Sequence, residues 1–414
     1  MNAKKLLALV LALVLCVGLV ACGNSNTPST PSNPGTSNTP STPSNPSNPS
    51  TPGSEAPTGP VTDSKGRYPA ETIKIGFVNY DPTAEQYLAL ETYFDYLAEA
   101  YNIEVMTSEA LNSAEGELAF IDACAAAGCQ AIFGYYNVSN EQAMLRAAEH
   151  GMYYFGQGAN KAFIENPEVM ANPYYLGSYT VGNADYEYGY GCIELLAQAG
   201  CKKIAGVSGG KNFGVQMFID RWQGAMDAIE DLGLELVYEV AGFPGTDGGF
   251  EAGPTAVLGM DDVDGVYSTL TALMWIKPTQ DAGKFGQLKF AAAGETMSEA
   301  AVGMFGAGFY VGTATEIIDV FGIGIPLIIN AIDGTPIRDE NGNAPLIKAG
   351  WWKVSNIGDA GYYASVQGGE NGWVFTSEDI RPLLVAYNPD VTVADYEALY
   401  TAVSAAEIQA RHAK

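Results

Sequence analysis

The chain has 414 residues, with 20 lysines and arginines against 47 aspartates and glutamates, and its formal net charge is −27. So acidic a surface repels nucleic acid and anionic lipid, which excludes functions that depend on binding either polyanion. About 350 residues follow the low-complexity start of the chain, enough for two domains of ordinary size.

Residues 1–21 have the pattern of a secretory leader. Lys4 and Lys5 precede an apolar run that ends at Ala21 and is too short to span a bilayer comfortably. The letters LVAC at 19–22 resemble a bacterial lipobox, in which the cysteine, here Cys22, is lipidated and becomes the new N-terminus. An uncleaved anchor and a plain secretory signal are the alternatives, and the small residues around Cys22 favour the lipobox. We therefore expect an extracytoplasmic protein tethered to the outer face of the cell membrane.

Residues 22–66 are dominated by serine, threonine, proline and asparagine. Such a segment has almost no apolar area to bury, and nothing offsets the entropy cost of ordering it. We expect a disordered tether there, with an O-glycosylated stalk as the alternative.

Four further cysteines follow, namely Cys124, Cys129, Cys192 and Cys201. The segments AGCQAIFG at 127–134 and AGCKKIAG at 199–206 echo each other, each typical of a helix that ends at glycine before a buried strand. No pair has the spacing of a metal site, so we expect neither a metal nor a cofactor, and free buried thiols rather than disulfides. The similarity of these two segments indicates that the two halves of the chain have the same order of helices and strands.

Short apolar runs alternate with helical patterns from Tyr68 onward. Strands are predicted at 72–78, 103–108, 130–136 and 152–156, with helices at 83–101, 113–128 and 139–151 between them. This alternation is the signature of a parallel, doubly wound α/β sheet with helices on both faces.

The same alternation resumes after a crossover that leads into a helix at 184–199. Strands are predicted at 202–208, 234–240, 263–268, 288–294 and 309–315, with a helix at 213–233 after the first of them. A last helix at 316–334 precedes a second connector near 340–350. The sequence thus predicts two α/β lobes joined by a hinge, and ligands of such sheets bind beyond the carboxyl ends of the strands.

From Glu71 to about Pro336 the chain resembles the periplasmic sugar-binding proteins of the ribose-binding type (periplasmic binding protein type I), whose lobes also form the cores of LacI-type repressors. The resemblance rests on the order of the stretches IKIGFVNYDPTAEQY, GCQAIFGYY, YTVGNADYEYGYGCIELLAQAG, RWQGAMDAIEDLG, VDGVYS, FAAAGE and FYVGTATEIIDVFG. It implies an N-terminal lobe of 70–180 plus about 316–345, and a C-terminal lobe of 181–315 plus about 346–414. The last 65 or so residues match the family little.

The resemblance implies a monomeric binding protein that captures a small polar ligand, a sugar, between its lobes and delivers it to a membrane ABC permease. A sensory receptor that signals to a kinase or chemoreceptor is one alternative, and a nucleoside-binding lipoprotein of the same fold is another. A repressor is disfavoured by the leader and the acidity, and no nucleic-acid partner is expected.

In the first lobe the resemblance places four ligand contacts in loops after strands. Asp81 precedes a proline where the family has a polar residue, although an Asx turn gives the same pattern. Tyr80 and Tyr136 end strands and could stack on a sugar face or pack in the core. Gln157 stands where the family has an Asp-Arg pair, a departure that argues against a simple aldopentose.

In the second lobe Arg221 matches the family's R-x-x-G, where the guanidinium reaches the ligand, with a structural ion pair as the alternative. Asn212 and Phe213 precede that helix, and Thr271 follows a strand where relatives have Asn-Asp. Glu295 takes the place of the family's Asp. Glu316 takes that of a hinge-side Gln, and a helix-capping role is its alternative.

Neither a histidine-based triad nor a metalloprotease or nucleotide-binding motif can be traced in the sequence. The chain has two histidines, His150 and His412, and neither belongs to a visible triad. There is no H-E-x-x-H or P-loop pattern, so we do not expect an enzyme.

Overall fold

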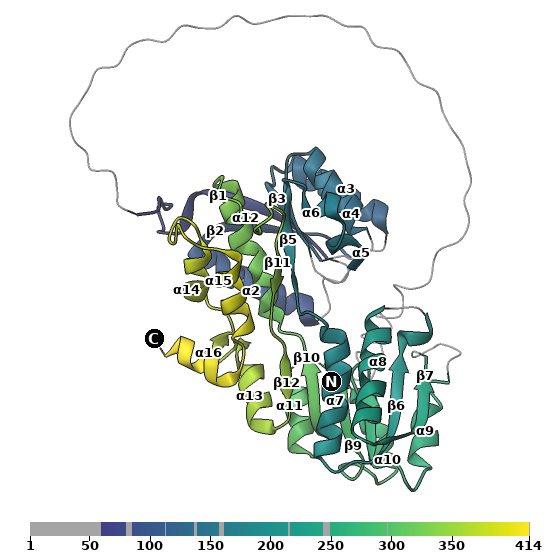
Figure 1. Ribbon diagram of the computed structural model, residues 1–414. Coiled ribbons are helices and arrows are strands. Elements are labelled where there is room, and N and C mark those ends of the chain that lie inside the picture. The colour runs from purple at the N-terminus through teal and green to yellow at the C-terminus, as the bar shows by residue number, and fades with distance from the viewer. Residues whose placement is uncertain are drawn as a thin grey trace, which may run out of the picture.

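The computed structural model describes residues 59–79, 85–111, 113–135, 139–156, 161–213, 216–242, 249–295 and 297–413. The expected leader, Cys22 and most of the expected tether lie outside these residues. Within the described ranges, no helix combines the length and the apolar character needed to cross a membrane. Two α/β lobes lie one beyond the other (Figure 1).

The first lobe is built on a parallel six-stranded sheet with the order β11-β5-β4-β3-β1-β2. Its strands are β1 (Tyr68–Val78), β2 (Tyr101–Thr107), β3 (Ala131–Gly134), β4 (Tyr153–Gly156), β5 (Tyr175–Thr180) and β11 (Leu346–Lys348). Its helices are α2 (Glu85–Ala100), α3 (Ala114–Ala126), α4 (Asn140–Glu149), α5 (Lys161–Ile164) and α6 (Pro167–Met170). Successive strand residues serve opposite faces: Phe133 packs with α2, whereas Ile132 packs with α3 and α4.

The second lobe repeats this plan with the strand order β12-β10-β9-β8-β6-β7, in which only the β10–β12 pairing is antiparallel. Its strands are β6 (Lys203–Gly209), β7 (Glu235–Ala241), β8 (Gly265–Ser268), β9 (Lys289–Ala293), β10 (Tyr310–Thr315) and β12 (Trp352–Val354). Its helices are α7 (Ala184–Gln198), η2 (Gly210–Phe213), α8 (Gln216–Asp231), α9 (Gly253–Leu258), η3 (Leu273–Trp275), α10 (Ile276–Asp281) and α11 (Glu299–Gly306).

The strands and helices expected up to residue 315 are confirmed, with ends that differ by a few residues. The exception is the continuous helix expected at 316–334. The structure has a 3₁₀ stretch, η4 (Ile318–Ile323), followed by α12 (Gly324–Ile332). Pro326 explains the break, because it lacks a backbone donor and fits only the first turn of an α-helix. Glu316 therefore precedes the helix and does not cap it.

The chain passes between the lobes after β5, after β10 and after β11. The last passage lies at 349–351, because Leu346–Lys348 pairs with β5 in the first sheet. The final second-lobe segment, expected from about 346, accordingly begins a few residues later. These three passages lie side by side and form the hinge. The candidate site lies next to this hinge.

A C-terminal segment, residues 357–413, contacts both lobes. It comprises α13 (Ile357–Ser365), β13 (Gln367–Gly369), β14 (Gly372–Trp373), α14 (Ser377–Ile380), η5 (Arg381–Leu383), α15 (Val393–Thr401) and α16 (Ala405–His412). Helix α13 packs on α11 of the second lobe, whereas α15 packs on β11 of the first. In Figure 1 the yellow helices α14 and α15 lie beside α2.

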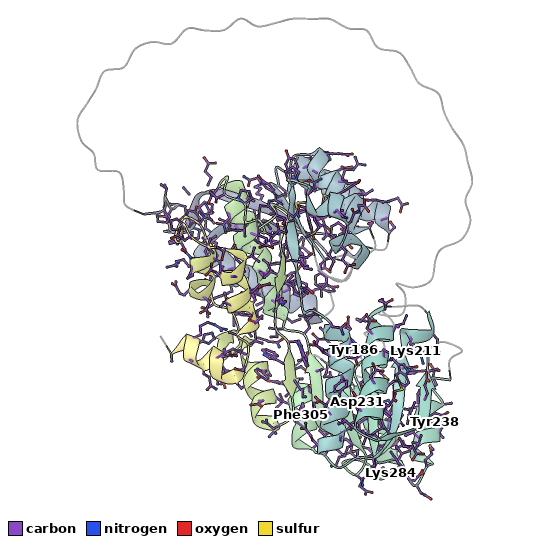
Figure 2. All side chains as sticks on the ribbon, in the orientation of Figure 1. Tyr186, Lys211, Asp231, Tyr238, Lys284 and Phe305 are labelled. Carbon is purple, nitrogen blue, oxygen red and sulfur yellow. The ribbon has the colours of Figure 1, made fainter. Side chains whose placement is uncertain are left out.

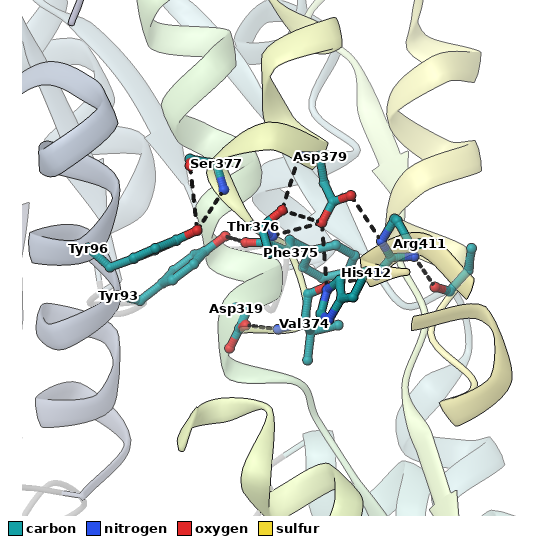
Figure 3. A network of polar contacts seen from close by, with 11 residues as sticks. Tyr93, Tyr96, Asp319, Val374, Phe375, Thr376, Ser377, Asp379, Arg411 and His412 are labelled. Atoms are coloured by element: carbon teal, nitrogen blue, oxygen red, sulfur yellow. Dashed lines mark hydrogen bonds and ion pairs between the residues drawn. The ribbon is translucent and has the colours of Figure 1, made fainter. Parts of the chain in front are cut away.

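The part of this segment at 374–377 is held from three sides (Figure 3). Tyr93 of α2 donates its hydroxyl to the carbonyl of Phe375 at 2.7 Å. The amide of Val374 donates to Asp319 of η4 at 2.6 Å, and Arg411 of α16 donates to the Val374 carbonyl at 2.7 Å. The segment is thus bonded to the first lobe, to the element after the hinge, and to its own last helix.

Asp319 is fully buried in this network. Its Oδ1 makes no hydrogen bond within the described residues. Burial raises the pKa of Asp319 to about 8, although the backbone amides that donate to the carboxylate oppose the shift. A carboxyl group that prefers its neutral form therefore lies under the C-terminal segment.

Helices α7 and α8 pack against each other at two glycines. A Cβ on Gly224 would lie 1.9 Å from the carbonyl oxygen of Tyr186, and one on Gly189 would lie 1.8 Å from that of Arg221. Neither oxygen can move without moving its helix. The two helices that carry the candidate site therefore approach each other as closely as backbone atoms allow.

Replacing Gly224 with alanine is expected to destabilise the fold by about 3 kcal/mol, because the new methyl group forces the two helices apart. Urea unfolding followed by circular dichroism measures the change. The matched control is Gly303→Ala in α11, where a Cβ has open space and the exchange should stabilise by up to about 1 kcal/mol. Equal midpoints for the two variants would contradict the close packing.

All four cysteines of the described part are free and buried, which confirms the expected thiols. Cys124 and Cys129 share a hydrogen bond that, together with burial, raises the pKa of the Cys124 thiol. Cys192 lies on the buried face of α7, and burial raises the pKa of its thiol to about 12. These side chains act as small apolar core residues.

Candidate functional site

Arg221 is the centre of a polar cluster at the carboxyl ends of the second lobe's strands. Helix α8 buries a stripe that includes Phe218, Trp222 and Ala225, and the arginine falls on this same stripe. Its Nε donates to Oδ1 of Asp185 at 2.8 Å, and its Nη1 donates to the carbonyl of Thr269 at 3.1 Å. The side chain, only 11% exposed, is thus held by α7 and by the loop after β8.

Glu316 lies on the second passage between the lobes. Its Oε1 accepts a hydrogen bond from the hydroxyl of Tyr179, at the end of β5, at 3.1 Å. This hydrogen bond connects the passage after β10, which carries Glu316, to the end of β5, where the first passage begins. Burial raises the pKa of Glu316, the charge of Asp185 adds to this shift, and the nearby Arg221 opposes it.

Asp185 contributes the carboxylate that pairs with Arg221. It occupies the first turn of α7, directly after the first passage. Burial raises the pKa of Asp185, and the charge of Arg221 and its hydrogen bond oppose the shift. The pair therefore places one fixed positive and one fixed negative charge beside the hinge.

Tyr188 lies one turn further along α7, and the guanidinium carbon of Arg221 is 5.6 Å from the centroid of its ring. The Tyr188 hydroxyl is buried without a hydrogen-bond partner among the described residues. Burial and then the charge of Glu316 raise the pKa of this hydroxyl far above its ordinary value. A buried hydrogen-bond donor thus lies close to the ion pair and within the electrostatic influence of Glu316.

Glu295 follows β9 and forms a second polar group. The hydroxyl of Thr271 donates to its Oε2 at 2.7 Å, and the Tyr310 hydroxyl donates to the same oxygen. Only 4% of Glu295 is exposed. Two neutral donors therefore orient this carboxylate.

Gly294 brings the two polar groups together. It has a φ of 79°, and a Cβ there would lie 2.6 Å from Nη1 of Arg221. The left-handed backbone and the missing side chain let the guanidinium lie directly against the turn that carries Glu295. Arg221, Asp185, Glu316 and Glu295 form what we call the hinge cluster.

Of the ten candidates, the structure brings Arg221, Thr271, Glu295 and Glu316 together. Asn212 is exposed on η2. Phe213 ends that element, and its side chain is not among the described ones. The first-lobe candidates Tyr80, Asp81, Tyr136 and Gln157 lie outside the described residues and stay predictions.

The sequence did not single out Asp185, Tyr179 or Tyr188. The available signal was Arg221 itself, since a cation on an apolar helix face needs a partner and Asp185 is the first acid after the crossover. The two tyrosines gave no such signal, because tyrosine at a buried position usually belongs to the core. In Figure 2, Tyr186, the neighbour of Asp185, lies at the end of the second lobe that is nearer the first lobe.

Comparison with solved structures identifies the arrangement. A periplasmic solute-binding protein of an ABC transporter from Actinobacillus succinogenes 130z, with bound D-allose, superposes with a TM-score of 0.57 at 14% identity, over 70% of this chain and 99% of that chain. The fold is that of the type I periplasmic binding proteins. No protein-family model and no curated protein matches the sequence.

Two further type I binding proteins give the same result. A galactofuranose-binding protein matches with a TM-score of 0.55 at 14% identity, over 71% of this chain and 98% of its own. The binding component of the arabinose ABC transporter of Shewanella sp. ANA-3, bound to α- and β-L-arabinofuranose, matches with a TM-score of 0.55 at 15% identity, over 71% and 95%. The expected fold class and the stated resemblance are confirmed. The hinge cluster lies where open parallel sheets bind ligands, beyond the carboxyl ends of the strands.

Proposed function

We propose that this chain is an extracytoplasmic solute-binding protein that captures a sugar between its two lobes and delivers it to an ABC permease. Lipidated Cys22 holds it to the outer face of the membrane, and residues 22–66 separate the folded part from the lipid. The protein binds its ligand without changing it chemically and acts as a monomer.

The observation that supports this proposal most is the hinge cluster. It combines a guanidinium, several carboxylate oxygens and a buried hydroxyl, which are the donors and acceptors that a polyhydroxylated ligand needs. The cluster adjoins the passages between the lobes, so a ligand that bonds to both lobes stabilises their closed arrangement. The similarity to structures solved with bound D-allose and with bound L-arabinofuranose agrees with this choice of ligand.

A thermal-shift screen of the purified protein against sugars, polyols, nucleosides and amino acids tests the proposal. A ligand at 100 times its dissociation constant adds about 2.7 kcal/mol of stability. For a folded part of about 350 residues, this amounts to a rise of about 4 °C in the unfolding temperature. We expect such a rise with at least one free sugar, and recovery of that sugar unchanged by NMR.

The screen separates the alternatives. A shift with a nucleoside or an amino acid and with no sugar would keep a solute-binding protein and overturn the sugar. Chemical conversion of the bound sugar would contradict a pure binding function. No shift with any class would contradict the proposal as a whole.

A further inference from the structure

The charges of the hinge cluster do not balance. The guanidinium of Arg221 is already paired with Asp185, with 2.8 Å between Nε and Oδ1. Among the described residues, no cation forms an ion pair with Glu316. A partly buried carboxylate without a counter-ion is costly, more so with Asp185 beside it. A bound cation would remove this cost.

Glu316 also has an unused acceptor. Its Oε1 accepts from Tyr179, whereas Oε2 makes no hydrogen bond to any described residue. Glu316 is half-buried, so this residue keeps some contact with solvent. Its Oε2 is therefore available to a donor from a ligand.

Tyr188 adds an independent observation. Only 2% of this residue is exposed, and its hydroxyl has no partner among the described residues. Its ring lies under the Arg221 guanidinium, and the charges of Glu316 and Asp185 both act on its hydroxyl. A buried donor without an acceptor, beside a carboxylate without a cation, matches a ligand that offers a hydroxyl and an ammonium on adjacent atoms.

We propose that the ligand is an amine-bearing sugar whose ammonium group binds Oε2 of Glu316. The ammonium forms a charge-assisted hydrogen bond there and neutralises the surplus carboxylate. Asp185 acts as a specificity-determining residue, because it cancels the charge of Arg221 that a carboxylated sugar would need. This inference rests on the proposed sugar-binding function and names the class of sugar.

Isothermal titration calorimetry on the full chain at pH 7.5 tests this inference with sugars of one configuration that carry a positive charge, no charge or a negative charge. For each of the gluco, galacto and manno configurations, the probes are the 2-amino sugar, the neutral hexose and the hexuronate. In at least one series we expect the amino sugar to bind at least about tenfold more tightly than the hexose, and the uronate not to bind. Added salt should weaken only the binding of the amino sugar.

The variant Glu316→Gln keeps the size of the side chain and removes its charge. It should lose the preference, so that this variant binds the amino sugar no more tightly than it binds the hexose. The matched control is Glu340→Gln, an exposed position on the connector before β11, which should keep the wild-type preference.

The possible outcomes distinguish a failure of this inference from a failure of the proposed function. If a hexose binds as tightly as its amino sugar, the inference fails and the sugar-binding function stands. If Glu316→Gln keeps the preference, Glu316 is not the ammonium site and the inference fails at that residue. If no sugar of the three series binds but the thermal-shift screen finds another sugar, the inference fails and the sugar-binding function stands. If the screen also finds no sugar, both fail.

Discussion

Replacing Arg221 with alanine is expected to lower ligand affinity at least about a hundredfold, as measured by calorimetry with the ligand found in the thermal-shift screen. Removing one partner of a buried, hydrogen-bonded charge pair typically costs 2–5 kcal/mol of binding free energy, and about 2.7 kcal/mol is a factor of a hundred. Arg221 is the one member of the hinge cluster that contacts α7, the loop after β8 and the turn at Gly294.

The variant Arg221→Lys should lose almost as much ligand affinity as Arg221→Ala. An ammonium group cannot reproduce the fork with which Nε bonds Asp185 while Nη1 bonds the Thr269 carbonyl. The control is Arg146→Ala on α4, whose partners Asp122 and Glu149 form an ordinary surface network that should leave affinity unchanged. Affinity within about threefold of wild type in Arg221→Ala would make Arg221 a structural residue only.

Most strands from β1 to β10 could be predicted because they are short, mainly apolar runs between helical patterns. The strand β5 was not predicted, because its residues were read as part of the crossover between the two halves. Strands such as Ala131–Gly134 are buried along their whole length, as a parallel sheet with helices on both faces requires. The C-terminal segment offers no such signal. Its elements, among them Gly372–Trp373 and Ser377–Ile380, are too short to have a hydrophobic period.

Arg221 could be predicted because a charged side chain interrupts an apolar helix face, but its partner could not. Asp185 lies 36 residues earlier in the chain. An acid in the first turn of a helix usually stabilises that turn, so the pattern alone does not reveal a tertiary ion pair. The pairing becomes visible only once Gly189 and Gly224 bring α7 and α8 together.

Asp319 shows how the C-terminal segment can make stability depend on pH. Its carboxyl group has an ordinary pKa of 3.8 when exposed in the unfolded chain and a pKa of about 8 in the fold. Between these values the unfolded state has released the proton that the folded state keeps. Raising the pH therefore favours the unfolded state, and the contribution to stability is lost progressively up to about pH 8.

The variant Asp319→Asn is expected to remove this slope, since an amide does not titrate and its oxygen can still accept from the Val374 amide. One proton corresponds to about 1.4 kcal/mol per pH unit, so the wild type should lose stability faster than the variant by up to that amount per unit between pH 5 and pH 7. Urea unfolding at a series of pH values measures both slopes. Glu117, whose pKa burial raises to about 7, contributes to the slope of both proteins and cancels in the comparison.

The exposed Asp261 provides the control, because Asp261→Asn changes the same chemical group where both states are in water. The free energy of unfolding of Asp261→Asn, plotted against pH, should run parallel to that of the wild type. Parallel curves for Asp319→Asn would mean that Asp319 stays ionised under the segment, with the Val374 amide and its neighbours sufficient to hold the charge. A flattened curve would mean that the bond between η4 and residue 374 depends on a proton, and so would the attachment of the C-terminal segment beside the hinge.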